Sequence, residues 1–352
     1  MVKVIVAGAG IMGLSTAYHL KKTIPEIDVV VYAKDFSPNL TSDGAAGLWE
    51  PYIPGETSIE LVSKWSQSTY DYVLDKIRTD PDSGNYGLMT CLGYNCSTSS
   101  DFQLPYWSSI PLDYHLLNER DVARRFPSWI KSAASFTSVF IEGTKYLPYL
   151  TKKFIELGGQ LCQKEIYSLD EIIVLHKFYG ECDVFVNCTG LGSKKLLKDD
   201  ELYAVRGHIL KVKANSIKEF LIVFEDTGPE MCTYVLPNQD YVILGGTKQL
   251  NNYDLTPNNE DREFILRTTS SIYPCLKSAE VLQEWVGLRP CRKSMRVEKE
   301  NFVVKSSIGS ENILKVVHNY GHGGSGLTVH WGCALETVKL VQEFLTEIKI
   351  KK

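Results

Sequence analysis

A glycine-rich turn near residue 10 constrains the fold more than any other feature of the sequence. Residues 2–7 form a largely apolar, β-branched run, and Gly8-Ala9-Gly10-Ile11-Met12-Gly13 follows directly. The order of strand, glycine turn and helix start is typical of a dinucleotide-binding βαβ unit. Gly8 permits the tight turn, Gly10 lets the backbone approach a pyrophosphate, and Gly13 lets the helix pack closely on the strand. A second apolar run at 29–32 supports this interpretation.

Composition excludes several other classes of protein. With 352 residues the chain is long enough for two lobes. Its 38 basic and 42 acidic residues give a net charge of −4, which argues against nucleic acid or an anionic membrane as partner. No apolar stretch approaches the ~20 residues that a membrane span needs. The nine cysteines form no CxxC pair and the first residues do not resemble a signal peptide, so we expect an intracellular protein that is not secreted.

Apolar patterning predicts an α/β organisation along the rest of the chain. We expect a helix at about 61–77, a buried strand at 183–190, a hairpin made by 234–237 and 241–246, and a second long helix from about residue 327. The small residues of 40–47 suit a loop that lies against a cofactor.

Three groups of residues could carry chemistry. Arg289, in Gly287-Leu288-Arg289-Pro290 at the end of a predicted strand, suits a two-point grip on a carboxylate, or else a surface ion pair. Tyr234 could join such a grip or be an ordinary strand tyrosine. The third group is the loop 318–326, whose histidines, with His330 beyond, suggest a metal site. Its four glycines argue against a metal, because ligands need rigid support, and favour a backbone pressed against a flat ring system.

Five segments together resemble the D-amino-acid oxidase and D-aspartate oxidase family of FAD-dependent enzymes. They are spread over the whole chain in the family's order: 8–13, 45–52, 187–190, 287–290 and 316–326, the last continuing to 332–334. The resemblance implies a Rossmann-type FAD-binding domain with an interleaved, mostly antiparallel β-sheet substrate domain. We expect residues 1–55, 140–195 and 290–352 in the FAD-binding domain, and 56–139 and 196–289 in the substrate-binding domain.

The resemblance also implies an activity, the oxidative deamination of D-amino acids to 2-oxo acids with release of ammonia and hydrogen peroxide. Arg289 and Tyr234 would hold the substrate α-carboxylate, and the carbonyl of Gly324 would accept a hydrogen bond from the α-amino group. This hold would direct the Cα–H to the flavin N5 and select the D-enantiomer. The expected FAD contacts are Gly8, Ala9, Gly10, Ile11, Met12, Gly13, Asp35, Thr41, Ser42, Ala46, Gly47, Leu48, Ile166, Cys188, Thr189, Gly190, Gly323, Ser325, Gly326, Leu327 and Thr328.

The chain departs from the family pattern at the ribose and side-chain positions. Family members have an acidic residue that binds the adenosine ribose, but this chain has Lys34 at that place and Asp35 one residue later. Either Asp35 or the loop near Thr41 and Ser42 takes that role. The segment 227–233 lacks the lid tyrosine of neutral-substrate members, and Thr227 stands where acidic-substrate members have an arginine. Lys248, after Gly245-Gly246-Thr247, could pair with the side-chain carboxylate of D-aspartate or D-glutamate. Glu230 would favour a cationic substrate instead, so acidic substrates are only modestly favoured.

Other interpretations stay open. The chain could be a broad oxidase for neutral or basic D-amino acids, or a flavin-binding protein without turnover. An NAD(P)-dependent dehydrogenase shares the opening motif, and a glycine or sarcosine oxidase shares FAD, but the late motifs favour neither. The expected partners are a small D-amino acid and oxygen, with a homodimer left open and neither nucleic acid nor membrane. Lys352 ends no S-K-L tripeptide, so both peroxisome and cytosol remain as locations.

Overall fold

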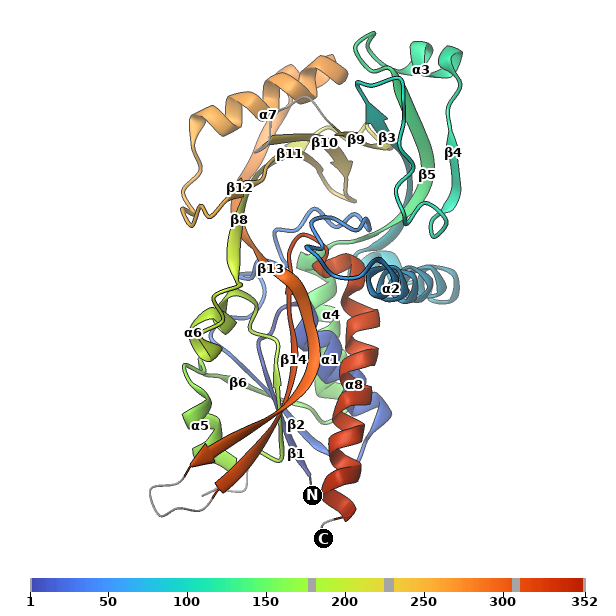
Figure 1. Cartoon of the computed structure of the whole chain (residues 1–352). Coiled ribbons are helices and arrows are strands. Elements are labelled where there is room, and N and C mark those ends of the chain that lie inside the picture. Colours follow the sequence, from blue (N-terminus) through green and yellow to red (C-terminus); the bar gives the residue numbers. More distant parts are fainter. Residues whose placement is uncertain (1, 177–181, 225–230, 306–310, 351–352) are drawn as a thin grey trace.

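A computed structural model describes residues 2–176, 182–224, 231–305 and 311–350, and it shows a mixed α/β fold built on one large sheet (Figure 1). The strands are β1 Lys3–Ala7, β2 Asp28–Ala33, β3 Leu88–Ser97, β4 Leu112–Leu116, β5 Ser132–Ile141, β6 Gln160–Gln163, β7 Val184–Asn187, β8 Tyr203–Lys213, β9 Phe220–Phe224, β10 Met231–Pro237, β11 Val242–Thr247, β12 Gln249–Leu250, β13 Glu280–Lys305 and β14 Glu311–His322. The α-helices are α1 Ile11–Thr23, α2 Ile59–Thr79, α3 Glu119–Arg125, α4 Gly143–Glu156, α5 Leu169–Val174, α6 Ser193–Leu197, α7 Asn259–Ile272 and α8 Gly326–Ile350.

One half of the sheet is parallel and has the predicted Rossmann character. Its order is β14-β7-β1-β2-β6, and each neighbouring pair in it is parallel. Helix α1 connects β1 to β2, as a crossover must between parallel strands. Apolar residues of α1 and α8 form a core on one face of these strands, and α5 and α6 cover the other face (Figure 1). Both faces are therefore buried, which explains the continuous apolar runs in the sequence.

The other half is mostly antiparallel, as predicted, and follows the order β4-β5-β3-β9-β10-β11-β8-β13. The hairpin expected at 234–246 is confirmed as β10 and β11, and the helices expected at 61–77 and from 327 are confirmed as α2 and α8. Helix α2 is amphipathic, and its buried side includes Val62, Trp65 and Val73. Among the described residues, no helix is both long enough and apolar enough to cross a membrane.

Strand β13 joins the two halves and corrects one expectation. Arg289 was predicted at the end of a strand, but β13 runs for 26 residues and continues past it. It pairs with β8 up to Cys291 and with β14 from Cys291 onward, with a register shift before Arg296. Pro290, which lacks an N–H, pairs with Ala204 of β8 just before the pairing with β14 begins at Cys291. The expected domain boundary at 289/290 thus falls within a continuous strand, and the division into domains stays a prediction.

Candidate active site

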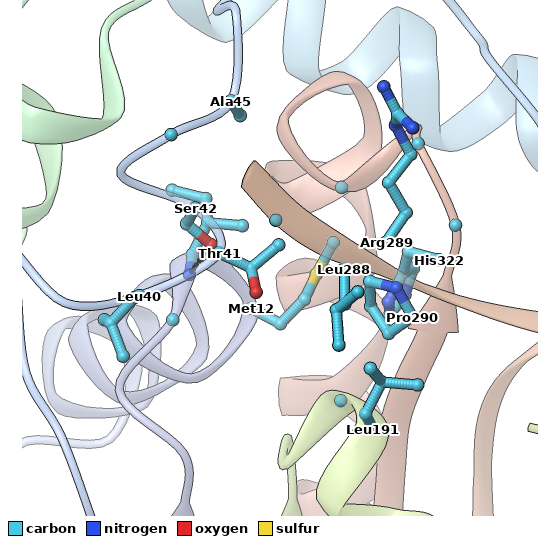
Figure 2. Close-up of a pocket in the computed structure, with 18 of the residues that line it drawn as sticks. Met12, Leu40, Thr41, Ser42, Ala45, Leu191, Leu288, Arg289, Pro290 and His322 are labelled. Carbon is cyan, nitrogen blue, oxygen red and sulfur yellow. Dashed lines mark hydrogen bonds between the residues drawn. The ribbon is translucent and has the colours of Figure 1, made fainter. Parts of the chain in front are cut away.

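A cavity of about 1160 Å³ is lined by residues from both halves of the sheet. It begins at the glycine turn after β1 and reaches the antiparallel strands that carry Tyr234 and Arg289. Figure 2 shows the loop with Leu40, Thr41 and Ser42 on one side, Leu288 and Pro290 on the other, and Met12 between them. The cavity therefore connects the dinucleotide motif with the predicted substrate residues.

The glycine turn has the geometry that its sequence predicts. Gly8 has a φ of +104°, and a Cβ there would lie 2.3 Å from the carbonyl oxygen of Cys188. No side chain caps the N-terminal end of α1 at Gly10, although the Ile11 N–H donates to the Ser42 hydroxyl at 3.2 Å. Gly13 does not line the cavity; a Cβ there would lie 1.9 Å from the carbonyl oxygen of Gly8. Gly13 thus lets α1 pack against the turn, and the start of α1 offers N–H groups to an anion.

Most of the predicted cofactor residues line this cavity. Those that do are Gly8, Ala9, Gly10, Ile11, Met12, Asp35, Thr41, Ser42, Ala46, Gly47, Leu48, Ile166, Cys188, Thr189, Gly190, Gly323, Gly326 and Leu327. Asp35, Thr41 and Ser42 all line the cavity, so the ribose contact, by Asp35 or by the loop near Thr41 and Ser42, stays a prediction. Ser325 and Thr328 lie behind the wall.

The hydroxyl groups of Ser325 and Thr328 fasten the segment 50–52 to the start of α8, and the cofactor contacts of these two residues stay a prediction. The Thr328 hydroxyl accepts from the Glu50 N–H at 3.1 Å and donates to the Glu50 carbonyl at 2.8 Å. The Ser325 hydroxyl makes the same pair of bonds with Tyr52, at 2.9 and 2.8 Å. We call these four bonds the double clamp. They fix the segment whose residues Leu48, Glu50 and Tyr52 face the cavity.

On the antiparallel half of the sheet, residues paired in register form a row along the cavity wall. Tyr234 on β10 lies opposite Ile222 on β9 and Gly245 on β11, and Gly245 lies opposite Ile209 on β8. The row continues to Trp285 on β13. Paired residues of neighbouring strands project from the same face of a sheet, and Ile222, Tyr234, Ile209 and Trp285 all line the cavity. The Tyr234 ring lies over Gly245, where a Cβ would come within 2.0 Å of it.

Arg289 lies on the same face of β13, four residues beyond Trp285. Its Nη1 donates to the Thr247 carbonyl at 3.0 Å, and its guanidinium lies 5.7 Å from the centre of the Tyr52 ring. Gly207 leaves room for it, since a Cβ there would lie 2.6 Å from Nη1. Burial raises the pKa of Tyr234 well above its usual value, so its phenol stays protonated beside Arg289. Arg289 forms no ion pair with an acidic residue in the described ranges, which leaves a cation facing the cavity.

The residues predicted to surround the side chain of the substrate lie only partly within the described ranges. Lys248 and Gly324 line the cavity, as does Cys232. Burial raises the pKa of the Cys232 thiol, although Arg289 and Lys248 oppose this shift. Lys248 forms no ion pair with an acidic residue among those the structure places. Thr227 and Glu230 lie outside the described residues.

Glu50, Tyr52 and Trp285 are among the cavity residues that were not predicted as site residues. Glu50 and Tyr52 belong to a motif that the sequence does show, and their alternation with Trp49 and Pro51 is the signal that could have identified them. Glu50 is buried, and burial raises the pKa of its carboxyl to about 8. Trp285 contacts the cavity only because β13 continues in register with β8.

The three histidines of the metal alternative do not converge. His330 Nδ1 lies 2.9 Å from the Ser15 hydroxyl, and His318 Nε2 lies 3.2 Å from Glu300. His322 lines the cavity, and burial lowers its pKa to about 3, so the ring is neutral. No group of three or more His, Cys, Asp or Glu side chains in the described ranges could hold a metal ion.

The shape and donors of the cavity fit FAD. A side chain at Gly8 would collide with the backbone of Cys188, so the turn keeps a side-chain-free cradle beside the start of α1. The cavity exceeds the roughly 300–1,000 Å³ of common small-molecule sites, as a dinucleotide together with a substrate requires. Gly8 to Met12 would hold the pyrophosphate, and Ala46 to Leu48 would border the ring system.

Comparisons with known proteins agree with this geometry. The family model described as DAO, FAD dependent oxidoreductase, matches residues 3–340. A D-amino acid oxidase from Dugesia ryukyuensis is 36% identical over 98% of this chain and 99% of its own length. A human D-aspartate oxidase is 34% identical over 97% of this chain and 95% of its own length. The crystal structure of glycine oxidase from Bacillus cereus has the same fold, with a TM-score of 0.74, 17% identity and coverage of 98% of both chains. The cavity, its glycine cradle and these similarities together show that the chain belongs to the DAO family of FAD-dependent oxidoreductases.

Proposed function

We propose that the protein oxidises D-amino acids with FAD as cofactor and oxygen as acceptor. One D-amino acid, oxygen and water would give a 2-oxo acid, ammonia and hydrogen peroxide. The observation that carries this proposal is Arg289, a cation that faces the cavity without an acidic partner in the described ranges. A buried cation of this kind needs an anion, and the guanidinium fork suits a carboxylate.

The neighbours of Arg289 suit the rest of an amino acid. The Tyr234 phenol, protonated at neutral pH, would donate a second hydrogen bond to the α-carboxylate. The Gly324 carbonyl would accept from the α-amino group, next to the ring of Tyr52. Bound FAD supplies the hydride acceptor and passes the electrons on to oxygen. The side chains themselves bind and orient the substrate and exclude water.

Lys248 supports a modest preference for acidic substrates. It lines the same cavity and has no ion-pair partner among the described acidic residues. An ammonium group at this place would attract the side-chain carboxylate of D-aspartate or D-glutamate, by roughly 1.5–3 kcal/mol if the pair is partly buried. The D-aspartate oxidase among the relatives is consistent with this preference.

The first test measures turnover of the flavin-loaded protein. Anaerobic bleaching of the flavin and oxygen consumption are measured with D-Asp, D-Glu, N-methyl-D-aspartate, D-Ala, D-Arg and the L-isomers. We expect bleaching by D-isomers alone. Bound FAD without bleaching by any of them would leave a flavin-binding protein without turnover and refute the proposal.

The acidic preference is tested with Lys248→Met, and Lys211→Met serves as the matched control. Lys211 is a buried lysine that does not line the cavity. Lys248→Met should lower kcat/KM for D-Asp by about 10- to 100-fold and leave D-Ala unchanged. Equal effects on D-Asp and D-Ala would refute a specificity role for Lys248 and favour a broad oxidase.

A further inference from the structure

A buried acidic side chain in the cavity wall has no cationic partner. Glu50 lines the cavity and is 8% exposed. Its Oε1 accepts from the Asn95 side-chain amide at 3.4 Å, a long hydrogen bond. Glu50 Oε2 and Asn95 Oδ1 are buried and have no hydrogen-bond partner among the described residues. No described lysine or arginine forms an ion pair with Glu50. Buried polar atoms without a partner are costly inside a protein, so this pair is suited to a polar ligand that supplies one.

Strand pairing places the Glu50–Asn95 pair at one end of the row that contains Tyr234. Asn95 on β3 lies opposite Ile222 on β9, and Ile222 lies opposite Tyr234 on β10. Two strand spacings separate Asn95 from Tyr234, which is about 10 Å between backbones. Both side chains project from the cavity face of the sheet. A side chain that starts at the Arg289–Tyr234 grip must therefore be long to reach Glu50.

We propose that Glu50, supported by Asn95, binds the ammonium or guanidinium end of long basic D-amino acids such as D-lysine and D-arginine. The inference rests on the proposed function, since it concerns the side chain of the same substrate. A glutamate carboxyl has a broad terminal torsion, so Oε2 can turn to the cavity from its place in the wall. A cation there would pair with the Glu50 carboxylate, while Asn95, which lies behind the cavity wall, would hold Oε1 in place. D-aspartate is too short for this contact and would depend on Lys248.

The electrostatics of the wall predict how this contact depends on pH. Burial raises the pKa of Glu50 to about 8, and the Asn95 hydrogen bond opposes the shift only in part. The titratable groups that face Glu50 are Tyr106 and Tyr114, and the pKa of both phenols is raised, first by burial and then by the charge of Glu50. They stay neutral below pH 9. Binding a basic side chain would therefore release the Glu50 proton, and KM for D-lysine should fall, relative to KM for D-norleucine, as pH rises from 6 to 8.

The decisive experiment compares D-arginine with D-citrulline, which has nearly the same shape but no charge. We expect the wild-type flavoprotein to prefer D-arginine by at least tenfold in kcat/KM. Glu50→Gln should reduce this preference to less than threefold, and its flavin absorbance and urea unfolding report on cofactor content and folding. The matched control is Glu142→Gln, another buried glutamate that lies outside the cavity and accepts from the Gln239 N–H at 2.6 Å. It should keep the preference for D-arginine.

The outcomes separate this inference from the proposed function. D-Ala turnover without discrimination between D-arginine and D-citrulline by the wild type would overturn the Glu50 assignment and leave the oxidase intact. An equal loss for both substrates in Glu50→Gln would also overturn it. Absence of turnover with every D-substrate refutes the proposed function itself. The wild-type comparison needs no variant, so an unstable Glu50→Gln protein would not remove the test.

Discussion

The double clamp predicts how much stability the protein should lose when the Thr328 hydroxyl is removed. Its hydroxyl bonds to both the N–H and the carbonyl of Glu50, and Thr328 is 1% exposed. Thr328→Val keeps the shape and removes both bonds, so two backbone groups lose their partner in a buried place. Each buried, unpaired group costs about 1–3 kcal/mol. We therefore expect Thr328→Val to lower the free energy of unfolding by about 2–4 kcal/mol, the upper values being reduced by partial relaxation of the segment.

Thr337 provides the matched control on the same helix. It is fully buried, and its hydroxyl donates to the Cys333 carbonyl at 2.7 Å. That carbonyl lies within α8 and keeps its helical hydrogen bond when the hydroxyl is removed. Thr337→Val should therefore cost about 1 kcal/mol or less.

Urea unfolding of the flavin-loaded proteins measures both variants, and D-Ala kinetics measure the site. The reasoning predicts a clear excess cost for Thr328→Val and a raised KM, because Tyr52 lies beside Arg289 on the clamped segment. If Thr328→Val is no more destabilising than Thr337→Val, the double clamp does not hold the segment as argued.

Three further predictions concern the cavity. Arg289→Met should lower kcat/KM for D-Ala by roughly 10²–10³-fold with FAD content unchanged, measured by steady-state kinetics and flavin absorbance, because a buried charged contact is lost. Gly8→Ala should lower the free energy of unfolding by at least about 3 kcal/mol and remove most of the bound flavin. Gly158 also has a positive φ, but no atom lies within 4 Å of an added Cβ. Gly158→Ala should therefore cost only about 1 kcal/mol of unfolding free energy and keep the flavin. The pKa of the Glu50 carboxyl is about 8 in the folded protein and 4.5 in the unfolded chain, so the folded state binds this proton more tightly. The contribution of Glu50 to stability is therefore fully present below pH 4.5 and is lost as the pH rises toward 8. The free energy of unfolding is measured with urea for Glu50→Gln and the wild type at pH 5.5 and 7.5. The difference between the two proteins should shift by about 2–3 kcal/mol in favour of Glu50→Gln over this range.

Each of these has a result that contradicts it. Normal D-Ala kinetics in Arg289→Met would refute the proposed binding of the substrate α-carboxylate by Arg289. Equal flavin loss in both glycine variants would show that backbone strain, and not the contact with Cys188, decides flavin binding. A stability difference between Glu50→Gln and wild type that does not change with pH would mean that Glu50 titrates normally.

Local patterns in the sequence were enough to predict the elements that local interactions determine. The glycine turn at Gly8, the hairpin of β10 and β11, and the amphipathic α2 all follow from spacing and turn residues. The extent of β13 did not follow, because Pro290 suggests a strand end, and only the pairing with β8 and β14 shows that the strand continues. Ser325 and Thr328 were assigned to the cofactor because they belong to the same glycine-rich segment as Gly323 and Gly326, and that assignment stays a prediction. The bonds of their hydroxyl groups to Glu50 and Tyr52 could not be predicted from local patterns, because these partners are far away in the sequence.

The long sequence separation within the double clamp has a consequence for biosynthesis. Glu50 and Thr328 lie 278 positions apart, so a growing chain cannot complete the cavity wall until α8 has left the ribosome. At the usual rates of about 5–20 residues per second, at least 14 seconds separate the synthesis of the two partners. During that interval the glycine cradle after β1 exists without the helix that closes the site. Flavin capture should therefore follow the synthesis of α8, and ribosome-bound chains that end before α8 should retain no flavin.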